Sequence, residues 1–179
     1  MPRGKCRGNC LCGGVRFEAA ADGEISCGMC HCSRCRRWSG GMPFTTFIAE
    51  VKLLSDKTLC WWKSSDWTER GFCGDCGSSL FWRAPDVPGA WGVSVGALEN
   101  ADEIKLALHI CIDDKPDFYD ITGDAPRETG AQHTAKVLSS LAKQFGKEFL
   151  EDALQKSRKF HGEKFAAEVE RLIAEKAAG

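Results

Sequence analysis

The chain has 179 residues, of which 43% are hydrophobic and 27% charged, and its formal net charge is -1. This length suits one domain with a proper core and a smaller appendage, and the near-neutral charge disfavours nucleic acid as a partner. No run approaches the roughly 18 apolar residues of a membrane span. The opening MPRGKCRGNC also lacks the apolar core of a secretory signal. We therefore expect a cytoplasmic protein that binds neither nucleic acids nor membranes.

Two regions of different composition follow one another along the chain. Residues 1–127 hold every cysteine, tryptophan and proline, whereas residues 128–179 hold none of them. Short alternating hydrophobic runs in the first region predict β-strands near 15–17, 45–48, 59–62, 80–82, 91–95 and 104–110. The last run places its isoleucines and leucines on one face, which we expect to line the core of a mainly antiparallel sheet.

The second region, 128–179, has the hydrophobic spacing of helices. One apolar stripe runs from Thr129 onward through Val137, Leu138, Leu141, Phe145, Phe149 and Leu150. A second helix, after a break at His161-Gly162, repeats the pattern with Phe165, Val169, Leu172 and Ile173. We expect both stripes to pack on the sheet domain or on a second subunit, which makes a homodimer through these helices an expectation.

Cysteine is unusually frequent, with 11 residues among 179. This fraction lies below the roughly 8–10% that marks a short secreted disulfide scaffold, and the number is odd. Seven of the cysteines form three groups with ligand-like spacing, which are Cys10-x-Cys12, Cys30-x-Cys32-x-x-Cys35 and Cys73-x-x-Cys76. Metal binding is therefore favoured over disulfides.

The seven cysteines divide into four plus three. A structural zinc takes four protein ligands, whereas a catalytic zinc takes three and keeps one position open. We expect the two outer pairs, Cys10, Cys12, Cys73 and Cys76, to form the closed structural site.

The middle triplet, Cys30, Cys32 and Cys35, is then the candidate active site with one open face. An alternative stays open here, because Cys27 has the spacing to close this site as a fourth ligand. The other three cysteines, Cys6, Cys60 and Cys111, are expected to be small buried or partly buried thiols. Cys60 and Cys111 lie in strand-like runs, and mobility is the alternative for Cys6, which is near a terminus.

Three segments resemble a known family. GNCLCGGVRF at 8–17, CHCSRCRR at 30–37 and FCGDCGSSL at 72–80 are similar to motifs of the glutathione-dependent formaldehyde-activating enzyme family, which includes the centromere protein V domain. GALE at 96–99 and HICIDDKPDF at 109–118 agree with it. The resemblance covers about residues 8–127, so the helical region inherits nothing from it.

The resemblance implies an Mss4-like fold of small coiled sheets with two zinc ions per chain. One zinc would be structural, on the outer pairs, and one catalytic, on the middle triplet. It also implies a carbon–sulfur lyase reaction that reversibly joins formaldehyde and glutathione, with glutathione as cosubstrate. A rival hypothesis is a non-catalytic, zinc-stabilised module that binds another protein.

Residues around the triplet are the remaining site candidates. His31 is a candidate proton carrier, against a structural role with hydrogen bonds to the backbone. Arg34, Arg36 and Arg37 are candidates for binding substrate carboxylates, against a role as surface charge. Trp38 is a candidate wall of the substrate pocket, against simple burial.

Overall fold

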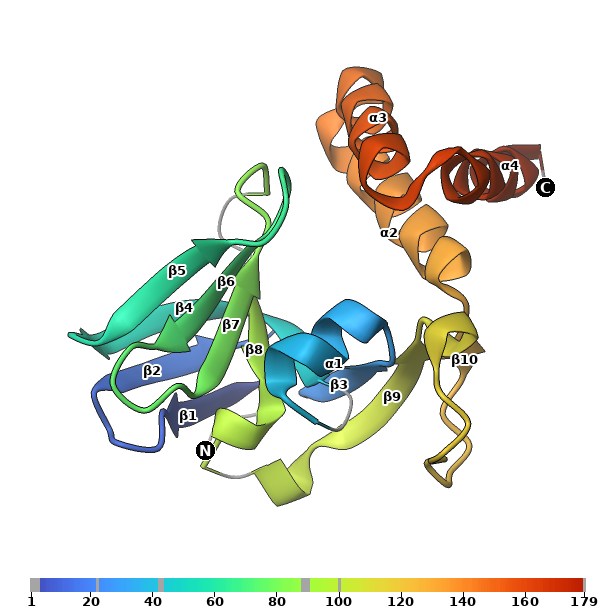
Figure 1. Ribbon diagram of the computed structural model, residues 1–179. Coiled ribbons are helices and arrows are strands. Elements are labelled where there is room, and N and C mark those ends of the chain that lie inside the picture. Colours follow the sequence, from blue (N-terminus) through green and yellow to red (C-terminus); the bar gives the residue numbers. More distant parts are fainter. Residues whose placement is uncertain (1–3, 22, 42–43, 88–90, 100, 179) are drawn as a thin grey trace.

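A computed structural model describes residues 4–21, 23–41, 44–87, 91–99 and 101–178. Within them, ten strands form one sheet whose main path runs β10-β9-β3-β4-β8-β7-β6-β5, with β1 and β2 joined to it through β4 (Figure 1). The strands are β1 (Lys5–Asn9), β2 (Val15–Ala20), β3 (Ser26–Cys30), β4 (Phe44–Asp56), β5 (Leu59–Lys63), β6 (Glu69–Cys73), β7 (Ser79–Arg83), β8 (Trp91–Ser94), β9 (Lys105–Ile110) and β10 (Arg127–Glu128).

The long strand β4 joins the two parts of the sheet. Its first half pairs with β3 and β8, and its second half pairs with β2. Most pairings are antiparallel, but β9 runs parallel to both β3 and β10. The predicted mainly β architecture with a helical C-terminal stretch is therefore confirmed. No helix in the described part of the chain is long and apolar enough to cross a membrane.

The main core lies between the strands and is built around aromatic rings. Phe17, Leu80, Phe81 and Val93 are completely buried, and the rings of Phe17 and Phe81 meet edge to face with centroids 4.9 Å apart. Burying a side chain of this size contributes roughly 1.5–3 kcal/mol. These residues fix the sheet from which both cysteine-bearing turns project.

Strand β9 differs from its predicted arrangement. Leu106 packs against the main core as expected, but the completely buried residue of this strand is His109, which alternation places on the other face. The register between β3 and β9 shifts after Cys27, and the backbone N–H of His109 donates to the Pro126 carbonyl. The His31 ring stacks on the His109 ring and covers a face that the sequence pattern predicts to be exposed, while β10 extends the edge of the sheet beside β9.

Four α-helices complete the described chain, namely α1 (Ser33–Ser39), α2 (Gly130–Phe145), α3 (Lys147–His161) and α4 (Glu163–Ala178). Thr129 caps α2, because its hydroxyl accepts from the Gln132 N–H while the Gln132 side chain accepts from the Thr129 N–H. The predicted single stripe to Leu150 is in fact two helices, since the chain turns at Gly146, where φ is 88°. The break predicted at His161-Gly162 is confirmed.

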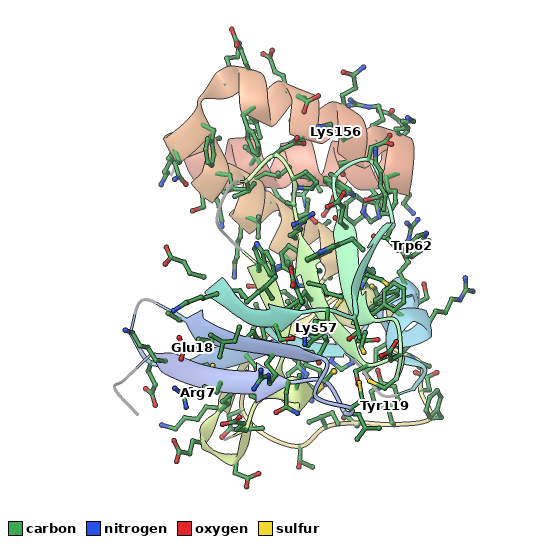
Figure 2. All side chains as sticks on the ribbon, turned by 90° about the vertical axis from the view of Figure 1, so that its left-hand side faces the viewer. Arg7, Glu18, Lys57, Trp62, Tyr119 and Lys156 are labelled. Carbon is green, nitrogen blue, oxygen red and sulfur yellow. The ribbon has the colours of Figure 1, made fainter. Side chains whose placement is uncertain are left out.

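Helices α2, α3 and α4 pack mainly against one another. Ala135, Leu138, Ala153 and Val169 form a small core of their own, separate from that of the sheet. Figures 1 and 2 show these helices as a group standing above the sheet, with Lys156 on their side of the molecule. This group is held to the sheet domain at its edge rather than across a broad face.

Candidate metal centres

The two outer cysteine pairs meet at one end of the sheet. The Sγ atoms of Cys10, Cys12, Cys73 and Cys76 all lie within 4.8 Å of one another. The measured separations are 3.5 Å from Cys10 to Cys12 and 3.6 Å from Cys12 to Cys73. We call these four residues the first cysteine group.

Two similar turns build the first cysteine group. The N–H of Gly13 donates to the Cys10 carbonyl, and the N–H of Gly77 donates to the Cys73 carbonyl. Both glycines have positive φ, 77° and 74°, which a residue with a side chain rarely adopts. The turns bend the chain so that the two cysteines of each pair present their sulfurs to the same point.

Hydrogen bonds to the sulfurs favour thiolates at two members of the first cysteine group, whereas the neighbouring thiols raise the pKa of Cys12 to about 12. The pKa of Cys76 is lowered to about 5, first because its sulfur accepts from the Ser78 hydroxyl and then because backbone N–H groups donate to it. The pKa of Cys73 is lowered mainly by the Thr58 hydroxyl, 3.1 Å away. Four converging thiols with donors around them are a donor set suited to a tetrahedral zinc.

The middle triplet lies where β3 meets α1. Cys30 ends β3, Cys32 is the N-cap residue of α1, and Cys35 lies in the first turn of that helix. The N–H of Cys35 donates to the Cys32 Sγ over 3.4 Å, which fixes the first helical turn on the sulfur. Arg70, on β6, donates to the Cys35 Sγ over 3.7 Å.

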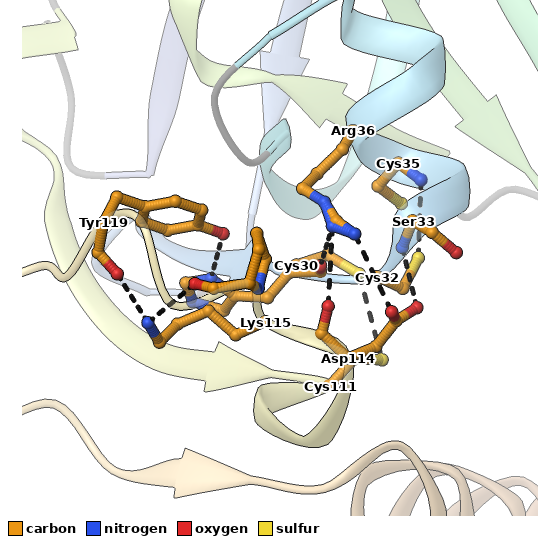
Figure 3. Close-up of polar contacts among 11 residues, drawn as sticks. Cys30, Cys32, Ser33, Cys35, Arg36, Cys111, Asp114, Lys115 and Tyr119 are labelled. Carbon is orange, nitrogen blue, oxygen red and sulfur yellow. Dashed lines mark hydrogen bonds and ion pairs between the residues drawn. The ribbon is translucent and has the colours of Figure 1, made fainter.

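A fourth thiol joins this triplet. The Sγ of Cys111 lies 4.0 Å from that of Cys30, and the sulfurs of Cys30, Cys32 and Cys111 are within 4.8 Å of one another (Figure 3). The Cys35 sulfur is outside this three-sulfur cluster but borders the same cavity, and we call Cys30, Cys32, Cys35 and Cys111 the second cysteine group. The sequence predicts Cys111 to be a packed thiol in a strand, whereas it follows β9 and faces the triplet.

The thiols of the second cysteine group influence one another strongly. The pKa of Cys32 is held well below its usual range, above all by hydrogen bonding from Cys111 and then from Cys30. The pKa of Cys30 is raised, first by its hydrogen bond with Cys111. One thiolate therefore forms readily while its neighbours keep their protons, and a divalent cation is the group that allows several to ionise together.

A cavity of about 450 Å³ opens beside the second cysteine group. All four of these cysteines line it, together with Arg70 and with residues of the segment 110–114. Its far wall comes from the C-terminal helices, which contribute Gly130, His133, Thr134, His161 and Phe165. The helical region thus borders the candidate site, which its sequence gave no reason to expect.

The four residues predicted to bind substrate lie in different surroundings. Arg34 borders the cavity, and its guanidinium carbon lies 3.5 Å from the centroid of the Phe160 ring. Arg36 contacts Asp114, with an ion pair of 3.7 Å. Among the described residues, Arg37 and Trp38 are not part of the cavity lining.

Trp38 lies one helical turn after the cavity-lining Arg34 and Cys35 on α1, but its ring packs on other aromatic side chains instead of lining the cavity. Its ring stacks on Trp62 with centroids 6.0 Å apart and meets Phe72 edge to face. Arg37 is exposed on the same helix. Of the four predicted substrate-binding residues, the structure therefore brings only Arg34 to the cavity wall.

His31 takes part in a buried polar chain instead of facing the cavity. Its Nδ1 lies 2.8 Å from the Tyr119 hydroxyl, and its Nε2 lies 2.9 Å from Nδ1 of His109. Burial is the main reason why the pKa of His31 is lowered to about 4, with the nearby His109 as the next cause. With both ring nitrogens engaged, His31 holds the end of β3 to β9 and to the segment around Tyr119.

The remaining thiols lie apart from both cysteine groups. Cys27 is buried in the main core, and its thiol donates to the Lys105 carbonyl over 3.6 Å. Its thiol lies in the core rather than in the lining of the cavity, so it does not close the second group. Cys6 is buried in the same core, whereas Cys60 is exposed rather than packed as predicted.

The fold and the two thiol clusters define a mainly β protein with two candidate metal centres, one of them beside a cavity. Residues 5–114 match the family model described as glutathione-dependent formaldehyde-activating enzyme. Because this match covers more than half of the chain, the protein belongs to that family. The family region ends before α2, so the helices that wall the cavity lie outside it.

Two known proteins are similar to this chain. An uncharacterized lyase of Schizosaccharomyces pombe is 30% identical over 139 residues, which cover 76% of this chain and 96% of that protein. A Rhodobacter sphaeroides protein of known crystal structure is 20% identical, with a TM-score of 0.46, over 68% of this chain and 99% of that one.

Proposed function

We propose that this protein is a zinc-dependent carbon–sulfur lyase that reversibly adds a thiol, glutathione or a similar molecule, to a small carbonyl compound such as formaldehyde. The observation that carries the proposal is the opening of the second cysteine group into a cavity. Family membership and the lyase name of the fission yeast relative support the same class of reaction. The first cysteine group would hold a second, structural zinc.

The reaction balances with one proton moved at each end. When the thiol adds, its S–H proton leaves, the carbon–sulfur bond forms and the carbonyl electron pair moves to oxygen, which takes a proton. In the reverse direction the hydroxyl proton leaves and the carbon–sulfur bond breaks. The second cysteine group would hold zinc, which would supply the positive charge that keeps a substrate sulfur deprotonated at neutral pH.

His161 is the proton carrier that this proposal assigns, in place of His31. It lines the cavity from the end of α3, and its ring stacks on Phe165 with centroids 4.3 Å apart. Desolvation by its surroundings, followed by the charge of Arg34, lowers the pKa of His161 below the usual histidine value. The imidazole is therefore neutral at pH 7 and ready to accept the hydroxyl proton during cleavage.

Arg34 is the candidate for binding a substrate carboxylate. It lies at the cavity wall with its guanidinium over the Phe160 ring, and one of its terminal nitrogens donates to the Phe160 carbonyl over 3.5 Å. A guanidinium has further N–H groups with which to bind a carboxylate. Glutathione carries two carboxylates, so one charged end would be held while the thiol reaches the cysteine group. Positioning of this kind accounts for much of the rate that an enzyme adds to a reaction between small molecules.

The test is exchange between free formaldehyde and its glutathione adduct, followed by NMR at equilibrium with the bound zinc counted beforehand. Wild type is expected to accelerate exchange over the uncatalysed rate, and Cys32→Ser to remove at least about 99% of that acceleration. Cys60→Ser, which changes an exposed thiol outside both groups, serves as the matched control and should match wild type. No acceleration by wild type carrying two zinc ions would overturn the proposal.

A further inference from the structure

Cys111 reaches the second cysteine group because of a parallel strand pair. Cys30, the last residue of β3, is paired with Ile110, the last residue of β9. The two strands therefore end side by side, and the next residue after β9 emerges beside Cys30. This places Cys111 on the one end of the sheet where a thiol can join the triplet.

The separation between the sulfurs of Cys30 and Cys111 matches that of two thiolates bound to one zinc ion. Zinc–sulfur bonds of about 2.3 Å in a tetrahedron place neighbouring sulfurs about 3.8 Å apart. The separation between Cys30 and Cys111 is 4.0 Å, and the first cysteine group shows 3.5 and 3.6 Å. By this measure, Cys111 is as well placed for a shared ion as the predicted ligands of the structural site.

The backbone at Cys111 is held in an unusual conformation. Its φ is 59°, and it is the single non-glycine residue with positive φ in the described part of the chain. The turn is fixed on both sides, since the His31 N–H donates to the Ile110 carbonyl and the Asp114 N–H donates to the Cys111 carbonyl. A left-handed cysteine retained in such a turn keeps its thiol beside Cys30 and Cys32.

The first residue of α2 borders the same thiol. A Cβ added to Gly130 would lie 3.6 Å from the Cys111 sulfur, and the Gly130 N–H donates to the Asp113 carboxylate over 2.7 Å. The start of the helical region therefore packs close to the Cys111 thiol. Cys111 is enclosed between the triplet and α2, with the cavity as its remaining open side.

We propose that Cys111 is the fourth thiolate ligand of the second metal centre in the resting protein, and that a substrate thiol must replace it before reaction. The second part rests on the function proposed above. The first part concerns this chain alone and can be tested with metal and no substrate. Together they make the second centre a capped site rather than a permanently open one.

The sulfur count around the metal tests the ligand assignment. In zinc-loaded wild type, X-ray absorption should give about 4 sulfurs per zinc. Without Cys111 as a ligand, one site would have four sulfurs and the other three, and the mean would be about 3.5. In cobalt-loaded protein, Cys111→Ser should lose about one eighth of the sulfur-to-cobalt charge-transfer absorption, whereas Cys60→Ser should lose none. A count of 3.5 in wild type would overturn the assignment, and this measurement does not depend on how the variant folds.

Alkylation with and without glutathione tests the replacement step. Mass spectrometry of zinc-loaded wild type should show that glutathione raises the alkylation rate of Cys111 at least about 10-fold while Cys30 stays protected. Four sulfurs per zinc with no glutathione binding would keep Cys111 as a ligand and refute both the replacement and the proposed function. Glutathione binding to a three-sulfur site would refute the role of Cys111 and leave the proposed function standing.

Discussion

The carboxylate of Asp114 accepts a hydrogen bond of 2.8 Å from the backbone N–H of Ser33 (Figure 3). This bond fastens the turn that carries Cys111 to the first turn of α1, immediately after Cys32. The same carboxylate forms an ion pair with Arg36. Asp114 therefore sets the distance between the two chain segments that supply the second cysteine group, without contacting a sulfur itself.

Replacing Asp114 with alanine is expected to weaken zinc binding at the second cysteine group by about 10-fold or more, the usual cost of losing a group that orients metal ligands. Asp114→Asn keeps an acceptor oxygen and should weaken zinc binding less than the alanine substitution does. Stepwise zinc release to a chromophoric chelator measures both sites in one experiment. The first cysteine group provides the internal control, and equal weakening of the two sites would contradict this role of Asp114.

The two cysteine groups should differ in what they stabilise. Cys76→Ala removes a ligand from the group that joins the turn after β1 to the turn after β6, so we expect a loss of about 3 kcal/mol or more in unfolding free energy. For a chain of this size, that corresponds to a fall in Tm of roughly 6–12 °C. Cys32→Ser should leave most of the stability in place. Thermal unfolding of the two zinc-loaded variants compares them directly, and equal losses would refute the division.

Tyr119→Phe tests the buried polar chain at His31. The substitution removes the hydroxyl that lies 2.8 Å from His31 Nδ1 and leaves this buried nitrogen without its partner. The expected cost is about 1–3 kcal/mol of unfolding free energy. Phe118→Leu is the matched control, because the neighbouring Phe118 side chain is 81% exposed. Denaturant unfolding that showed no difference between the two variants would indicate that the His31 ring finds another partner.

His161→Gln should change how the cleavage rate depends on pH. The pKa of His161 is lowered, so the neutral imidazole that accepts a proton persists at pH 7 and is lost as the pH falls through that pKa, below about 6.5. Wild type should therefore show an acid limb in this range, and the glutamine variant should lose this limb along with most of the rate at pH 7. An unchanged pH profile in His161→Gln would remove His161 from the reaction.

Most of what could be predicted from the sequence rests on the spacing of cysteines within short segments. The two cysteines of each outer pair, Cys10 with Cys12 and Cys73 with Cys76, are close to each other in the chain. The turn within each pair needs only the glycine beside it. The structure brings these four thiols together, as the spacing predicts, and it also brings Cys30, Cys32 and Cys35 to one cavity. Family motifs confirmed by the family model lie in the same local segments.

The parts that the sequence did not reveal depend on contacts between distant segments. Cys111 joins the triplet because β9 runs parallel to β3. The hydrophobic pattern of β9 indicates a strand but does not predict which strand it pairs with. His161 was placed correctly at a helix break, but its position at the cavity depends on how α2, α3 and α4 pack together. The burial of His109 likewise involves a distant residue, His31, whose ring stacks on it.

During protein synthesis, the first cysteine group is completed before the second, because its last cysteine comes earlier in the chain. Cys12 and Cys73 are 61 residues apart, so the first cysteine group is complete once β6 and the turn after it have left the ribosome. Cys30 and Cys111 are 81 residues apart, and the second group must wait for β9. A metal ion bound to the first cysteine group of a nascent chain would therefore stabilise the first strands. At that stage the second cysteine group is incomplete and cannot compete for the ion.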